Sequence, residues 1–126
     1  MNIKEEWLKC YNDKSGIYFI EKFLYTFNAD VRREVPMVLF PRQKVFLHSI
    51  AEKPNTVAIK HRQCGCTTCA SAWTTMRCAL ADAKSPETIL CIGNNLQISR
   101  QLVDKCRQFL KCTPRWFFGN KCILPN

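Results

Sequence analysis

The stretch KHRQCGCTTCASAW, residues 60–73, gathers lysine, arginine, glycine, threonine and cysteine side chains that could do chemistry. It follows the apolar run TVAIK (56–60) and leads into a segment with helical spacing of apolar residues. Phosphate binding is physically favourable at such a place. The first-turn N–H groups of a helix have no intrahelical partner, and the helix dipole puts partial positive charge at the same end.

The residue types of this loop suit a phosphate site, although they depart from the usual pattern G-x-x-x-x-G-K-[ST]. Cys66 stands where that pattern has its lysine, and Lys60 stands where it has its first glycine. A lysine at the start of the loop can fold back over the phosphates and deliver the same charge from the other side. Arg62 adds a second cation with planar donors, and Gly65 permits a close approach of the backbone with positive φ. The sequence therefore predicts a phosphate-binding loop.

Two other interpretations of the loop remain open. One is a zinc site, for which the spacing offers four ligands of suitable type: His61, Cys64, Cys66 and Cys69. These ligands are crowded into one short stretch, whereas structural zinc sites usually pair two separated turns, and Cys69 also fits an apolar helix stripe. The other interpretation is an ordinary strand-to-helix turn. A disulfide is disfavoured, because nine cysteines without a secretory signal indicate a reducing compartment.

Charge is distributed unevenly along the 126 residues, of which 47% are hydrophobic. Residues 1–35 hold six basic and six acidic side chains, whereas residues 36–126 hold thirteen against four and so carry the whole net charge of +9. A basic second part indicates an anionic partner such as nucleotide or nucleic acid. A small basic nucleic-acid-binding protein is therefore an alternative to a nucleotide-binding domain. No apolar run approaches the length of a membrane span.

Hydrophobic spacing predicts helices in the front part and alternating strands and helices behind it. The front part is expected to hold helices at 2–12, 15–27 and 41–53, with an extended run at 34–40. Behind it, the apolar runs 56–60 and 88–93 predict buried parallel strands. The helices after them are expected from Thr67 and from Asn94 or Asn95 to about Lys111, asparagine being a favoured cap residue. Strand, helix, strand, helix predicts an α/β fold with right-handed crossovers.

In this order the motifs resemble tailed-bacteriophage terminase large subunits, the motors that package DNA into empty capsids. The loop K-x-R-Q-x-G-x-T-T (60–68) resembles their variant Walker A motif, in which some members place the lysine at the start. The resemblance extends through YFIEKFL, FPRQKVFL, ILCIGNNLQISRQLVDKCRQFL and TPRWF. It implies an incomplete P-loop NTPase (ASCE-type) three-layer core with parallel strands, preceded by a helical N-terminal segment.

Carried over residue by residue, the resemblance implies a site for ATP and Mg²⁺. Gln43 would match the glutamine that recognises the adenine edge, with an exposed helix residue as the alternative. Lys60 would contact the β- and γ-phosphates, and the Thr67 hydroxyl would reach Mg²⁺. Arg62 would stabilise the transferring phosphoryl group, with an ordinary surface arginine as the alternative. The cradling backbone would comprise Gln63, Cys64, Gly65, Cys66, Thr67 and Thr68.

The resemblance also implies how the chain is divided and what it lacks. Residues 1–53 would form a helical lead-in with the adenine motif, and residues 54–126 a partial ATPase core without the nuclease domain of the family. The family's Asp-Glu pair is absent, since Asp104 is the only acidic residue after Gly93. The expectation is the N-terminal part of a DNA-packaging terminase in the bacterial cytoplasm, which binds ATP without hydrolysing it alone. Its implied partners are double-stranded DNA and, in the parent protein, the small terminase subunit and the capsid portal, with no membrane.

Overall fold

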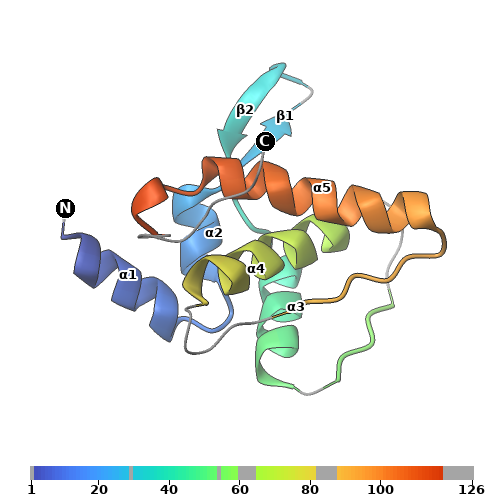
Figure 1. Ribbon diagram of the computed structural model, residues 1–126, viewed down its shortest axis with the longest axis horizontal. Coiled ribbons are helices and arrows are strands. Elements are labelled where there is room, and N and C mark those ends of the chain that lie inside the picture. Colours follow the sequence, from blue (N-terminus) through green and yellow to red (C-terminus); the bar gives the residue numbers. More distant parts are fainter. Residues whose placement is uncertain (1, 29, 54, 60–64, 82–87, 118–126) are drawn as a thin grey trace.

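The computed structural model describes residues 2–28, 30–53, 55–59, 65–81 and 88–117, arranged as in Figure 1. Within these ranges the chain forms five α-helices, one short 3-10 helix and one two-stranded antiparallel sheet. The elements in chain order are α1 (Ile3–Asn12), α2 (Ile17–Phe23), β1 (Tyr25–Asn28), β2 (Arg33–Pro36), α3 (Pro41–Glu52), α4 (Cys66–Leu80), α5 (Leu96–Cys112) and η1 (Arg115–Phe117). The protein is therefore mostly helical over its described part.

The first two helices begin at polar side chains that accept first-turn N–H groups. The Asn2 side-chain oxygen accepts from the backbone N–H of Lys4 at 3.1 Å, which caps α1 and confirms the helix expected at 2–12. The Asp13 carboxylate accepts from the Tyr18 N–H at 2.9 Å and so fixes the start of α2. The helix expected at 15–27 is correct only to Phe23, because the chain turns to extended backbone at the next residue.

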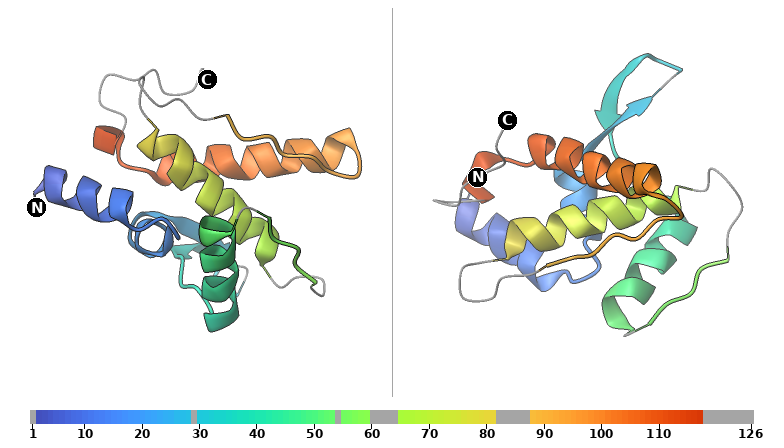
Figure 2. Two further views of the ribbon diagram at one scale, coloured as in Figure 1. Left: turned by 90° about the horizontal axis from the view of Figure 1, so that it is seen from below. Right: turned by 45° about the vertical axis from the view of Figure 1, so that its right-hand side comes forward.

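The antiparallel hairpin takes up the residues that end the predicted second helix. Strand β1 pairs with β2 in a register that places Thr26 opposite Val35. The extended run expected at 34–40 is thus a strand only in its first part. In Figure 2 the hairpin projects from the helical body. Helix α3 begins at Pro41, so this proline lies in the first helical turn, as expected.

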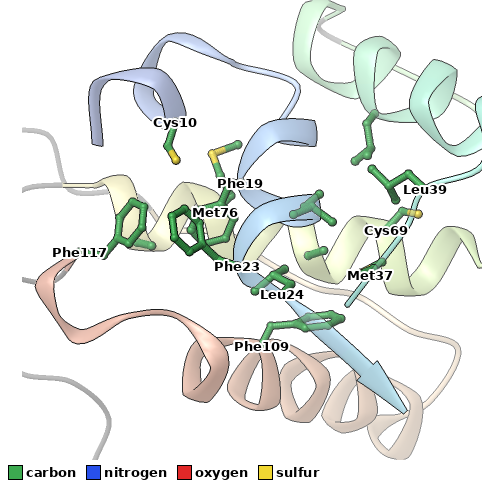
Figure 3. Close-up of a cluster of buried hydrophobic side chains, with 14 residues drawn as sticks. Cys10, Phe19, Phe23, Leu24, Met37, Leu39, Cys69, Met76, Phe109 and Phe117 are labelled. Carbon is green, nitrogen blue, oxygen red and sulfur yellow. The ribbon is translucent and has the colours of Figure 1, made fainter. Parts of the chain in front are cut away.

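Helix α4 is the centre of the helical body and packs against α2, α3 and α5. The stripe expected on this helix is confirmed, since Cys69, Ala72, Met76 and Ala79 are at most 1% exposed. Figure 3 shows side chains from α1, α2, the β2–α3 connection, α4 and η1 gathered in one cluster, with Phe109 entering from α5. The buried set comprises Cys10, Phe19, Ile20, Phe23, Leu24, Met37, Leu39, Leu47, Cys69, Ala72, Met76, Ala79, Phe109 and Phe117.

The prediction of a parallel sheet is wrong for the described residues. The prediction of a three-layer P-loop core is therefore wrong for them as well. Residues 55–59 and 88–93 are assigned to no strand, and the only sheet in the described ranges is the β1–β2 hairpin. Most apolar side chains of these segments face solvent, with Ile59 100% and Leu90 80% exposed, whereas Ile89 and Cys91 are half-buried. The physical reason lies in the helices. Because α4 and α5 pack directly against each other, with Phe109 of α5 buried in the core, no sheet lies between them.

Candidate nucleotide site

The described part of the predicted phosphate loop is its second half, Gly65 to Thr68. The expectations for Lys60, His61, Arg62, Gln63 and Cys64 fall outside the described residues. Gly65 is the N-cap of α4 and has a φ of +83°, in the left-handed region that side chains disfavour. The positive φ expected for this glycine is therefore present, and it directs the chain into the helix.

The first turn of α4 carries neither a capping side chain nor an acidic residue. Gly65 offers no side chain to accept the first-turn N–H groups, and the earliest helical bond runs from the Cys69 N–H to the Gly65 carbonyl at 2.9 Å. No acidic side chain lies in this turn to offset the helix dipole. The Thr67 side chain is exposed, as a hydroxyl that reaches a bound magnesium ion would be, and Thr68 is half-buried.

Gln43 and Gly65 lie in direct proximity although they are far apart in sequence. Gln43 is the third residue of α3, and its Oε1 accepts a hydrogen bond from the Phe40 N–H at 2.9 Å. Its amide Nε2 is the nearest atom to the position that a Cβ at residue 65 would take, so a side chain there would have to displace this flexible amide. A glycine is favoured at this N-cap chiefly by its backbone conformation.

Lys105 is a further cation at this helix start, and the sequence analysis assigned it no role. Its Nζ donates to the Thr68 Oγ1 at 2.8 Å, from α5 across to the first turn of α4. The neighbouring acid, Asp104, pairs instead with Arg107 at 3.6 Å. The packing of α5 on α4 therefore brings a positive charge to the end of α4 that already carries the positive end of its dipole. Nothing in the linear spacing reveals this contact, because it depends on how the two helices cross.

The described cysteines of this region differ in how far their thiols are buried. Cys69 is fully buried in the core, and Cys66 is half-buried. Burial raises the pKa of the Cys106 thiol above its ordinary value, helped by nearby Cys91. Within the described residues no three His, Cys, Asp or Glu side chains come together as metal ligands do, and two of the four proposed zinc ligands lie outside those residues. The arrangement thus lends no support to a zinc module.

Comparisons with protein-family models, with curated proteins and with solved structures find no match. Among the helices in the described part of the chain, none is both long and apolar enough to cross a membrane. The function must therefore be inferred from the residues and their arrangement.

Proposed function

We propose that the chain binds ATP with Mg²⁺ through residues 60–68 and Gln43, as the nucleotide-binding part of a DNA-packaging terminase large subunit. The observation that carries the proposal is the position of the Gln43 amide against Gly65. Gln43 is proposed to contact the base, and Gly65 is proposed to lie against the phosphates. Their proximity supports the proposal, because it places both groups within reach of a single nucleotide.

Each part of the nucleotide has a matching group. The backbone N–H groups at the start of α4 suit the phosphate oxygens, and Lys60 and Arg62 supply positive charge from the same loop. The exposed Thr67 hydroxyl suits Mg²⁺ held between phosphates. An amide carries both donors and an acceptor, the kinds of group that recognition of the adenine edge uses, and the Gln43 oxygen also accepts from the Phe40 N–H.

The chemistry proposed for the chain alone is binding without turnover. Hydrolysis needs a carboxylate that positions or activates the attacking water. In this sequence Asp104 is the only acidic residue after Gly93, and in the structure it lies on α5 paired with Arg107. The expected activity of the chain by itself is therefore ATP binding, and DNA translocation belongs to the proposed parent protein.

Thermal unfolding with and without Mg²⁺ and a non-hydrolysable ATP analogue tests the proposal. A ligand at about one hundred times its dissociation constant stabilises the folded state by about 2.7 kcal/mol, which raises the melting temperature by several degrees. Lys60→Ala should abolish this shift. Lys53→Ala is the matched control, because it removes the same charge from an exposed position shortly before the loop.

Gln43→Glu tests the base contact separately. The carboxylate keeps an acceptor for the Phe40 N–H, so α3 retains its start, while the amide donor is lost. We expect the variant to lose the preference for the adenine over the guanine nucleotide and to keep its melting temperature without ligand. An equal shift in wild type and Lys60→Ala would falsify the phosphate-loop proposal, and an unchanged base preference in Gln43→Glu would remove Gln43 from it.

A further inference from the structure

Three cations form a stripe along α5. Arg100, Arg107 and Lys111 are all exposed and stand at positions i, i+7 and i+11. At about 100° and 1.5 Å per residue, they fall within about 40° of one another around the helix and span about 16 Å along it. From Leu96 to Phe117 the sequence has five basic residues and a single acid, Asp104. We name Arg100, Arg107 and Lys111 the cationic stripe.

The packing of α5 directs this stripe away from the core. Phe109 is 6% exposed in the core cluster, and Leu110 packs against that cluster. The apolar side of α5 therefore faces α4, and the cationic stripe lies on the solvent side of the same helix. In Figure 2 α5 runs along the outside of the helical body for its whole length.

We infer that the cationic stripe is a docking surface for the phosphate backbone of double-stranded DNA. Charge complementarity with a polyanion is the first reason, since cations on phosphates supply most of the sequence-independent affinity for duplexes. The length of the stripe is the second reason. The major groove of B-form DNA is about 12 Å wide and admits an α-helix, so a straight row of cations about 16 Å long can follow the phosphates at its edge. The major groove of duplex RNA is too narrow to admit a helix.

Two other polyanionic partners fit this surface less well. Proteins that hold single strands stack bases on aromatic side chains, and the only aromatic residue of α5, Phe109, is buried in the core. A helix that lies on a membrane inserts its apolar side between the lipids, whereas on α5 the largest apolar side chain, Phe109, is buried in the core and only Leu96, Ile98 and Val103 are exposed. The inference uses only α5 and does not depend on the proposed nucleotide site.

Fluorescence anisotropy of a labelled B-form duplex of about 20 bp, titrated with the full chain without nucleotide, tests the inference. The variant replaces the whole cationic stripe, as Arg100→Gln/Arg107→Gln/Lys111→Gln. The matched control, Lys4→Gln/Lys14→Gln/Arg33→Gln, removes three exposed cations from the front part, so both variants change the net charge from +9 to +6. Circular dichroism confirms that both retain their helices.

The expected result is a difference in how strongly duplex affinity depends on salt concentration. Three phosphate contacts contribute about 2.7 to the log–log slope of affinity against salt. Between about 50 and 200 mM salt, the wild-type affinity should therefore fall about 40-fold further than that of the stripe variant, and the control should behave as wild type. Asp104→Asn removes the acid beside the stripe without touching the core, and should raise affinity about twofold at low salt.

Other outcomes would overturn the inference. Equal losses in the two triple variants would mean that only net charge attracts the duplex. Tighter binding to duplex RNA, to a single strand or to phosphatidylserine vesicles would assign the surface to that partner instead. Lys60→Ala should bind the duplex as wild type does, so failure of ATP binding and failure of DNA binding are separate results.

Discussion

The α1–α2 region and the α4–α5 region handle their charges in opposite ways. In the first, Glu6 is 7% exposed, and its carboxylate accepts from the Tyr18 hydroxyl at 2.6 Å and the Lys22 ammonium at 2.8 Å. In the second, the cations of α5 greatly outnumber the single acid between Leu96 and Phe117, and Lys105 contacts a hydroxyl. Charge is balanced inside the chain in one region and left in excess in the other.

The difference separates charges that hold the fold from charges that can hold a ligand. The hydrogen bond from Lys22, followed by that from Tyr18, lowers the pKa of Glu6, and the same contact raises the pKa of Lys22. Each group thus favours the charged form of the other, which stabilises the folded state. On α5, Arg107 has within the described residues only an exposed pair with Asp104 at 3.6 Å and Lys105 contacts a hydroxyl, so most of the positive charge of this helix is left for an anion from outside.

The largest expected effect concerns the packing of α5, on which the outward direction of the cationic stripe depends. Phe109→Ala removes the ring that α5 places in the core and should lower the free energy of unfolding by about 3–5 kcal/mol. Gln108→Ala, at the exposed neighbouring position, should change it by less than about 0.5 kcal/mol. Urea unfolding followed by circular dichroism measures both. A similar small loss in the two variants would mean that α5 is not held on α4, and the contrast between its two faces would fail.

The second prediction concerns the balanced pair in the front region. Glu6→Gln should lower the melting temperature at pH 7, because it removes the partner of Lys22. Since the pKa of Glu6 is lowered from 4.5 in the folded state, its stabilising contribution is present above about pH 4.5 and is lost as the pH falls through its folded value. The melting temperatures of wild type and variant should therefore converge in acid.

The matched control for this pair is Glu5→Gln, which makes the same change at an exposed position of the same helix turn. It should leave the melting temperature and its pH dependence close to those of wild type. A difference between wild type and Glu6→Gln that stays constant from pH 7 to acid would show that the carboxylate acts by packing and not by charge.

The helices could be predicted from the sequence because their signals are local. Asn2 and Asn95 cap α1 and α5, and Pro41 begins α3, as the residue types indicate. The strands could not be predicted in the same way, because an apolar run such as 88–93 forms a strand only if a neighbouring strand pairs with it. In the structure Leu90 and Ile92 remain about 80% exposed and their segment lies in no sheet.

In the candidate site, too, features set by the local sequence could be predicted, whereas features set by the packing of helices could not. The conformation of Gly65 follows from its place before a helix, so spacing alone was sufficient for it. The family resemblance assigned Gln43 and Gly65 to one site but did not predict their direct approach, because it depends on the packing of α3 against α4. The contact of Lys105 with Thr68 was missed, since a lysine on the polar side of a helix has no sequence signal that separates it from its solvated neighbours.

The smallest expected effect concerns Lys105 and sharpens the contrast within α5 itself. If its ammonium passes from the Thr68 hydroxyl to a bound phosphate, Lys105→Gln should weaken the ATP analogue about threefold, because exposed charge contacts contribute up to about 1 kcal/mol. Lys111→Gln makes the same charge change on the stripe side of α5 and should leave ATP affinity unchanged. Duplex binding should respond in the reverse order. Isothermal titration with the analogue measures the first pair, and equal weakening by both substitutions would mean that Lys105 acts through net charge and not at the helix start.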